Sequence, residues 1–565
     1  MVAATPTPPT SRAEAIALGL IIAAAALLRL PLLGTVPNGL FLDEAARGYD
    51  AYALLVTGAD QFGVRWPLFP EGLDDYTPVL YTLSVIPSVA VLGLTETAVR
   101  LPSALAGLLT VVLTFLSGRL LFGSAAGLVG AALVAISPWH ILPSRTGAEW
   151  NLLPLFVTAG VWLLLRGRTH GPSLLVAGMV LGIGLYSYAF ARLLVPLLLV
   201  GFAALWWRDL LARWRWSLAG AACFIALALP MVAFGLTPEG QARLQTVVPL
   251  DRYRGLALVP YAASNFLSYF GPGFLIWGSE PTHHHRLPGF GPILLVMVPL
   301  VLAGLAAVVR QPSRASLFCL WWIVAAPASA ALHRESPSSA LLLGAIPAWQ
   351  LFSGFGAGWL RLGWANLTPQ APGDDLTPQP PLRRGEGEKS GVLPPVSVVV
   401  EARCIAPLRG AVLPGGLLVA ALLLTAVFVA RSLYIEYPVV AAEDWLYGAR
   451  ETVAYLEAHR DEFDGVLVSD RLPSAHILVL FYAGVDPRTY QQAPIHVRQP
   501  AVRARGEIGP YAFGRTQDLL DRPGRYLLWL PGNEDRTRFG SQRPALDVSL
   551  PDGRPAQVVY EVQRR

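Results

Sequence analysis

Long apolar runs recur along this chain of 565 residues, and most are long enough to cross a bilayer as a helix. The first run, Ala13 to Leu33, has no small-residue cleavage site close after it, so we expect a retained span. Ten more runs lie near residues 102–121, 124–142, 152–166, 172–190, 193–207, 216–235, 291–309, 315–332, 337–360 and 411–431. Because 54% of the residues are hydrophobic and only 14% are charged, we expect an all-α polytopic membrane protein with about eleven transmembrane helices.

The segment Pro78 to Leu94 decides the orientation of this bundle. It is short and carries Pro87, so it could cross the membrane or lie at its surface. If it does not cross, the arginines of the short loops all fall on the side of the N-terminus, as the positive-inside rule requires. These arginines are Arg119, Arg166, Arg168, Arg208, Arg213, Arg215, Arg310, Arg314 and Arg361. We therefore expect a cytoplasmic N-terminus in the plasma membrane.

The expected organisation divides the chain into four parts. Residues 1–360 form a transmembrane core whose first outer loop, 34–101, carries amphipathic helices. Residues 361–410 are rich in Pro, Gly and charges and are typical of a disordered cytoplasmic linker or insertion. The last transmembrane helix covers 411–433, and residues 434–565 form a small extracytoplasmic α/β domain.

Within that last domain, a helical pattern covers Glu443 to Phe463. Residues 465–470 and 525–531 are expected to form short strands, and residues 476–485 a strand or a helix. The stretch from Gln491 to Gly514, rich in Pro, Arg and Gly, is expected to be a loop.

Charge and cysteine usage exclude several functions. The net charge of +5 comes almost wholly from arginine, since Lys389 is the single lysine, and the arginines lie in short loops rather than in one basic stripe. This distribution indicates membrane topology and argues against nucleic acid binding. Cys223, Cys319 and Cys404 lie far apart and form no metal-binding spacing, so we expect neither disulfides nor a zinc site.

An acidic pair, Asp43 and Glu44, follows a few residues after the first apolar run. Carboxylates near hydrocarbon are costly unless they are paired, so such a pair more often marks a functional site than a requirement of the fold. The alternative is that both residues only cap the helix that follows.

Other ionisable residues of the expected outer face divide into early acids and late cations. Besides the acidic pair, they are Asp50, Asp60, Glu71, Asp74 and Asp75, then Arg145 and Glu149, then His283 to Arg286 and His333 to Glu335. This division suits a reaction in which a carboxylate activates an acceptor while Arg and His hold an anionic leaving group.

Several short elements follow one another in a recognisable order. After the acidic pair come a G-x-D-x-x-G turn (Gly58, Asp60, Gly63), a D-Y-x-P-x-x-Y element (Asp75, Tyr76, Pro78, Tyr81), AVRLPSALAG at 98–107 and SPWHILPSRTG at 137–147. In this order the chain resembles the glycosyltransferase C superfamily, and within it the protein O-mannosyltransferase and aminoarabinose lipid A transferase branch. The resemblance covers roughly the first 200 residues.

The resemblance implies transfer of a sugar from a polyprenyl-phosphate carrier to a lipid, glycan or protein acceptor at the outer membrane face. Asp43 is then the catalytic carboxylate. A polyprenyl phosphate is already a good leaving group, so one base and a cationic pocket suffice, and displacement predicts inversion. Glu44 would position Asp43 or an arginine.

Further residues are candidates for substrate binding. Asp75, Tyr76 and Tyr81 belong to the second acidic element, which would bind acceptor or sugar hydroxyls; the alternative is a solvated loop. Where the aminoarabinose branch has a lysine, this chain has Thr77. That departure weakens a lipid A assignment and leaves donor phosphate binding to arginine or histidine.

Two pairs could supply that charge. Arg145 and Glu149 resemble residues of the family's second outer loop, or they brace a turn. His333 and Arg334 form a phosphate clamp or snorkel to the interface. The histidines at 283–285 cannot all face one ion from a regular element, so a divalent cation stays an open possibility.

Two other functions compete with this hypothesis. One is an oligosaccharyl or polymer ligase that uses a polyprenyl diphosphate donor and would need a more elaborate acidic metal site. The other is a transporter or flippase of lipid-linked sugars, whose signature would be paired charges at mid-membrane and broken helices. The sequence shows neither signature.

Overall fold

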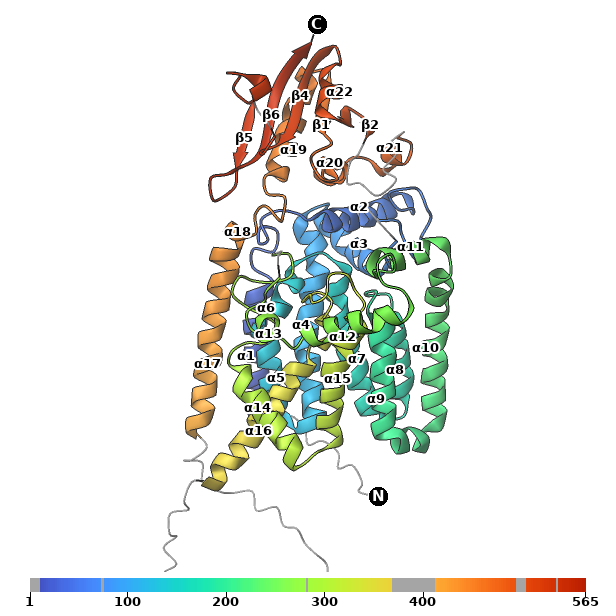
Figure 1. Cartoon of the computed structure of the whole chain (residues 1–565), viewed down its shortest axis with the longest axis vertical. Coiled ribbons are helices and arrows are strands. Elements are labelled where there is room, and N and C mark those ends of the chain that lie inside the picture. Colours follow the sequence, from blue (N-terminus) through green and yellow to red (C-terminus); the bar gives the residue numbers. More distant parts are fainter. Residues whose placement is uncertain are drawn as a thin grey trace, which may run out of the picture.

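A bundle of helices carries a small α/β domain at one end (Figure 1). The structure is a computed structural model, and it describes residues 11–72, 76–280, 283–367, 412–493, 505–534 and 537–564. The segment 368–411, most of the expected cytoplasmic linker, lies outside these ranges, as does Asp75.

Each of the eleven predicted apolar runs contains a helix. These are α1 (Arg12–Arg29), α4 (Glu96–Phe122), α5 (Ser124–Ile136), α7 (Leu153–Gly167), α8 (Pro172–Gly184), α9 (Ala191–Ala212), α10 (Trp214–Gly235), α14 (Met297–Arg310), α15 (Arg314–Ala330), α16 (Ala348–Leu367) and α17 (Val412–Arg431). Among the described residues, five helices are long and apolar enough to cross a membrane, or six if a helix pair bent by 66° at Ser137 counts as one. The protein is therefore polytopic, and the number of eleven spans stays a prediction.

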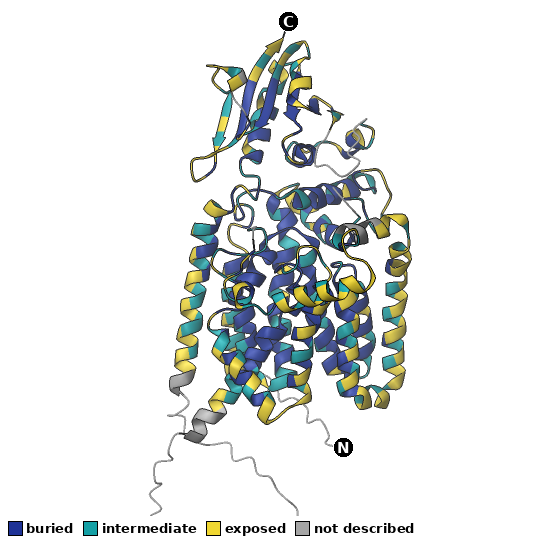
Figure 2. Ribbon diagram, in the orientation of Figure 1, coloured by how far each residue is buried: buried dark blue, intermediate teal, exposed yellow. Residues whose placement is uncertain are grey.

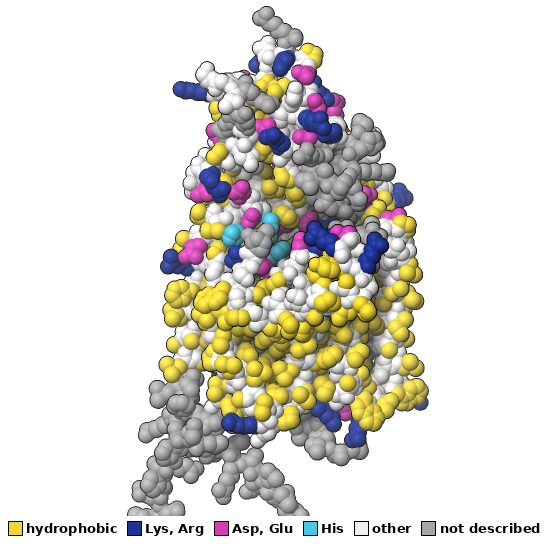
Figure 3. Space-filling view, in the orientation of Figure 1, with side chains coloured by type: hydrophobic (Ala, Val, Ile, Leu, Met, Phe, Trp, Pro, Cys, Tyr) yellow, Lys and Arg dark blue, Asp and Glu magenta, His cyan; other side chains and the backbone are white. Residues whose placement is uncertain are grey.

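An apolar band surrounds the bundle. Large hydrophobic side chains are exposed along its helices, above all on α10 and α17, and they form a continuous yellow belt in the space-filling view (Figures 2 and 3). In water such a surface would be unfavourable, whereas lipid chains solvate it without cost. Together with the apolar helices, the belt identifies an integral membrane protein.

Two helices of the first outer loop lie at the end of the bundle that faces the α/β domain (Figure 1). Helix α2 (Leu42–Thr57) begins where the Glu44 carboxylate accepts a hydrogen bond from the amide of Phe41, and it ends at Gly58, whose φ of 71° suits glycine. Helix α3 (Leu80–Leu92) has 13 residues, about 20 Å, which is shorter than the hydrocarbon core of about 30 Å.

The C-terminal domain contains a six-stranded sheet in the order β2-β3-β1-β4-β6-β5. The strands are β1 (Gly465–Ser469), β2 (Gly506–Ile508), β3 (Tyr511–Gly514), β4 (Gly524–Pro531), β5 (Leu546–Ser549) and β6 (Pro555–Arg564). Strands β3, β1 and β4 are parallel, and the other neighbours pair in antiparallel fashion. Residues 476–485, predicted as a strand or a helix, contain helix α20 (Ala475–Tyr482), and α19 (Ala449–His459) matches the helical pattern.

One prediction for this domain was wrong. The stretch expected to be a loop up to Gly514 contains β2 and β3 in its described part. Tyr511 to Gly514 pair with Val466 to Ser469, more than 40 residues earlier in the chain. A strand of four residues gives no periodic signal of its own, because its stability comes from a distant partner.

The α/β domain and the bundle share one hydrophobic core. Side chains of α2, α3 and α4 pack in the same cluster as those of α19, α20 and β1. They approach closely at Gly48 of α2, where a Cβ atom would lie 2.6 Å from both Phe481 of α20 and Val99 of α4. Helix α20 is therefore seated directly on α2.

Candidate functional site

A polar cavity of about 420 Å³ lies between the bundle and the C-terminal domain. Its charged lining residues are Asp43, Arg47, Glu149, Arg334 and Glu335, together with His284, His285 and His333. They come from α2, from the turn before α7, from the loop 276–296 and from the loop after α15. The cavity thus brings together Asp43, Glu149, His333 and Arg334 from the residues singled out in the sequence.

Asp43 lies in the first turn of α2, and Arg47 follows one turn later on the same face of that helix. Arg47 is only 3% exposed, and its Nε lies 3.7 Å from Oε2 of Glu149. Within the part of the chain that the structure describes, neither Nε nor Nη1 of Arg47 has a hydrogen-bond partner. Sequence reasoning missed Arg47, although the i, i+4 spacing from Asp43 was a usable signal.

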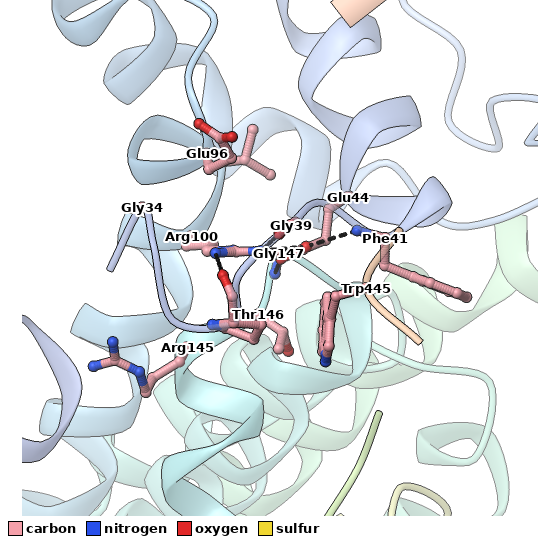
Figure 4. A network of polar contacts seen from close by, with 12 residues as sticks. Gly34, Gly39, Phe41, Glu44, Glu96, Arg100, Arg145, Thr146, Gly147 and Trp445 are labelled. Atoms are coloured by element: carbon pink, nitrogen blue, oxygen red, sulfur yellow. Dashed lines mark hydrogen bonds and ion pairs between the residues drawn. The ribbon is translucent and has the colours of Figure 1, made fainter. Parts of the chain in front are cut away.

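Glu44 points away from the cavity and into a buried ion pair with Arg100 of α4. Its two carboxylate oxygens each accept a hydrogen bond of 2.9 Å from the Arg100 guanidinium. The same carboxylate accepts hydrogen bonds from the amides of Phe41 and Gly147, and Arg100 also donates to the carbonyl of Gly39 (Figure 4). Glu44 thereby joins the start of α2 to α4 and to the loop before α7.

Arg145 is fully buried and does not line the cavity. Its guanidinium donates to backbone carbonyls of the turn that leads from α1 to α2, and it points away from the Glu44–Arg100 pair (Figure 4). The acceptors are Leu28, Arg29, Pro31, Leu32 and Val36. With its donors engaged in this way, Arg145 braces the turn between α1 and α2, whereas Glu149, with which the sequence analysis grouped it, lies near Arg47 instead.

The loop after α15 forms the rim of the cavity. Arg334 is partly exposed and donates to Asp251, while its amide donates to the carbonyl of Val247. The ring of His333 packs against Phe190 at a centroid distance of 5.4 Å. Arg334 therefore lies at the cavity edge, and a ligand that binds its guanidinium would compete with Asp251.

The three consecutive histidines face different partners. Nδ1 of His283 lies 3.1 Å from Asp444, and Nε2 of His284 lies 2.6 Å from the carbonyl of the same residue. His285 packs edge to face against Trp150, and burial lowers its pKa to about 3, so its ring is neutral at physiological pH. In the described ranges, no group of three or more His, Cys, Asp or Glu residues is placed to hold a metal ion.

The residues of the second acidic element, 75–81, lie in different surroundings. Tyr81 is fully buried, and its hydroxyl donates to the carbonyl of Val99 and lies 2.8 Å from Ser103, so it joins α3 to α4. Tyr76 packs edge to face on Phe234. Thr77 lines the cavity, and its buried hydroxyl has no partner among the described residues.

A second group of buried polar side chains continues from Arg47 along α2. Asp50 is fully buried and accepts a hydrogen bond of 3.1 Å from the amide of Gln61. Among the residues with described positions, Oδ2 of Asp50 and both amide atoms of Gln61 lack hydrogen-bond partners. Burial raises the pKa of Asp50 to about 7, and the nearby charge of Arg47 opposes that rise.

Comparison with known proteins agrees with this architecture. A family model described as "Dolichyl-phosphate-mannose-protein mannosyltransferase" matches residues 78–234. Two solved structures of ArnT from Cupriavidus metallidurans, one bound to undecaprenyl phosphate and one in the apo state, match with a TM-score of 0.53. They are 13% and 14% identical in sequence, and the matches cover 98% and 97% of this chain and 98% of each ArnT chain.

The chain has the glycosyltransferase C fold. The match to ArnT and the mannosyltransferase family model confirm the resemblance seen in the sequence. A curated protein of Bacillus subtilis (strain 168), named "Putative mannosyltransferase YkcB", is 33% identical over 112 residues. That match spans 20% of this chain and 16% of the Bacillus protein.

The buried ion pair of Glu44 predicts that replacing Glu44 destabilises the protein, whereas replacing its neighbour Asp43 does not. Glu44→Gln leaves the Arg100 charge buried without a counter-ion, which costs about 3–5 kcal/mol. We expect a large fall in the midpoint of thermal unfolding of the purified protein, whereas Asp43→Asn, at the cavity wall, leaves the midpoint near the wild-type value. Equal midpoints for Glu44→Gln and wild type would contradict the structural role of the pair.

Asp50 predicts a pH dependence of stability. Its pKa is about 7 in the folded protein and about 4 in an unfolded chain, so the folded state holds the proton more tightly. The stabilising contribution is complete below pH 4 and disappears as the pH rises to about 7. We expect the unfolding midpoint of the wild type to fall more steeply between pH 5 and 7.5 than that of Asp50→Asn; parallel curves would contradict the raised pKa.

Proposed function

We propose that this protein is a membrane glycosyltransferase that moves a sugar from a polyprenyl-phosphate carrier to a lipid, glycan or protein acceptor. The observation that carries the proposal is the cavity itself, in which Asp43 and Arg47 lie one helical turn apart at the end of a membrane-embedded bundle. A carboxylate beside a buried guanidinium suits a reaction that removes a proton from one substrate and leaves an anion on the other.

In the proposed reaction, Asp43 accepts the proton of an acceptor hydroxyl. The acceptor oxygen forms a bond to the anomeric carbon of the donor sugar, and the bond from that carbon to the phosphate oxygen breaks. The electron pair leaves with the polyprenyl phosphate, whose charge grows during the step, and the configuration at the anomeric carbon is inverted. Cationic groups that meet the phosphate therefore stabilise the transition state more than the ground state.

Arg47 is the best placed cation for that phosphate. It is buried, it lines the cavity with Asp43, and two of its donor atoms are without hydrogen bonds among the described residues. Arg145, the earlier candidate, donates to backbone carbonyls elsewhere. Arg47 on α2 would supply the charge that a lysine supplies at the position of Thr77 in the aminoarabinose branch. Arg334 and His333 would approach from the rim.

The proposed orientation places the cavity and the C-terminal domain outside the cytoplasm, in the plasma membrane. Supporting this, the junctions from α9 to α10 and from α14 to α15 lie at the end of the bundle away from the C-terminal domain (Figure 1). Arg208, Arg213, Arg310 and Arg314 belong to these junctions or to the helix ends beside them. A concentration of arginine in short loops at one end is typical of the cytoplasmic side.

Replacing the base tests the function directly. Purified wild type in nanodiscs, given undecaprenyl-phosphate sugars with a radiolabel and a membrane lipid extract, should transfer label to acceptor, and Asp43→Asn should lower the rate at least a hundredfold because no carboxylate takes the proton. A thermal unfolding midpoint for Asp43→Asn near the wild-type value serves as the folding control. Undiminished transfer by Asp43→Asn would contradict the mechanism.

The role of Arg47 predicts a specific kinetic change. Arg47→Gln removes the charge that stabilises the departing phosphate, so kcat should fall more than tenfold, while Arg334→Gln, at the exposed rim, should have a smaller effect. The measurement is initial transfer rate against donor concentration. If Arg334→Gln lowers kcat more than Arg47→Gln does, the phosphate is bound at the rim instead.

A further inference from the structure

The outer wall of the cavity comes from the C-terminal domain. Ser474, in the loop between β1 and α20, lines the cavity together with Asp43 and Arg47, although more than 420 residues separate it from them in the chain. Ser474 is only 3% exposed, so it is enclosed by the bundle and the domain together. The cavity is therefore completed by a domain that the family model, ending at residue 234, does not include.

Ser474 is also the residue at which α20 begins. It precedes the first helical residue, Ala475, and its side chain makes no capping hydrogen bond to the helix. The first amide groups of a helix have no partner within the helix, and they carry a partial positive charge. Ser474, the cap of α20, lines the cavity, so the start of this helix lies at the cavity wall, where an anion would meet the amides of its first turn.

The guanidinium of Arg47 is a second, independent sign of an anion in the same cavity. Arg47 is only 3% exposed. Its Nε and Nη1 atoms have no hydrogen-bond partner in the described part of the protein. Oε2 of Glu149 lies 3.7 Å from Nε of Arg47, which is beyond hydrogen-bonding distance. A buried guanidinium in this state gains two or more charge-assisted hydrogen bonds from a phosphate.

The packing fixes Arg47 and α20 relative to each other. Gly48, the next residue after Arg47, is the point where the ring of Phe481 of α20 rests on α2, and a Cβ atom there would lie 2.6 Å from that ring. The hydroxyl of Tyr49 donates to the carbonyl of Val485, just after α20. The packing of α2 against α20 therefore sets the position of Arg47 relative to the start of α20.

We propose that the first turn of α20 binds the phosphate of the lipid carrier together with Arg47, so that the C-terminal domain is part of the phosphate site. This inference rests on the proposed function only in that the ligand carries a phosphate. The group that the site would bind is a phosphate ester. Its negative charge is larger on the free polyprenyl phosphate, the product of transfer, than on the sugar donor.

The test compares two variants at the start of α20 that have the same side-chain size and differ only in charge. Ser474→Asp puts a carboxylate where the phosphate oxygens would lie, and Ser474→Asn, which has the same shape without charge, is the reference. Aspartate and asparagine both tolerate the left-handed backbone of Ser474, whose φ is 41°. Aspartate also favours the start of a helix, so we expect no loss of folding stability.

The measurement is the dissociation constant of undecaprenyl phosphate for the full-length protein in nanodiscs. We expect Ser474→Asp to bind at least tenfold more weakly than Ser474→Asn. Ser549→Asp, on exposed β5 of the same domain, adds the same charge away from the cavity and should bind like the wild type. We also expect the double variant Arg47→Gln/Ser474→Asp to lose less binding free energy than the sum of the losses in the two single variants. The reason is that both changes act on one phosphate.

The outcomes separate this inference from the proposed function. If the wild type binds undecaprenyl phosphate and Ser474→Asp and Ser474→Asn bind it equally well, the role of α20 is overturned and the proposed function stands. If the wild type itself does not bind undecaprenyl phosphate, the proposed function fails, and this inference fails with it. Should Ser474→Asp unfold at a lower temperature, Ser474→Glu provides a second charged variant for the same comparison.

Discussion

The buried ion pair between Glu44 and Arg100 is the interaction on which the site depends. It joins the start of α2 to α4, and its hydrogen bonds to Phe41, Gly39 and Gly147 hold the loop before α2 and the loop before α7 at the same point. An ion pair without access to water is costly unless nearly every donor and acceptor is used, as here. With α2 held by this pair, Asp43 and Arg47 on another face of the helix line the cavity.

The two residues of the acidic pair, Asp43 and Glu44, therefore have different roles. Asp43 lines the cavity, and Glu44, one residue later and on another face of the helix, points into the core. The arginines divide in the same way, since Arg47 lines the cavity while Arg100 and Arg145 hold loops together. Successive side chains of a helix point about 100° apart, and here that rotation turns Asp43 to the cavity and Glu44 to the core.

Much of this was predictable from local pattern. Each of the eleven apolar runs contains a helix in its described part, and the helical and strand patterns after the last run locate α19, β1 and β4. The cavity residues Asp43, Glu149, His333 and Arg334 could be chosen because charged residues near helix ends at a membrane surface are costly. Arg47 could have been chosen from its i, i+4 spacing to Asp43, whereas Ser474 and strands β2 and β3 had no such local signal, because their surroundings come from distant segments.

The sequence by itself determined that this is a polytopic membrane protein with the glycosyltransferase C order of elements, since apolar length and short motifs are local properties. Only the tertiary structure decided which charges face the cavity. Arg47 and Arg145 have the same side chain, and what separates them is whether backbone carbonyls surround the guanidinium or leave its donors exposed to a cavity. That difference depends on packing between segments far apart in the chain, and no local pattern encodes it.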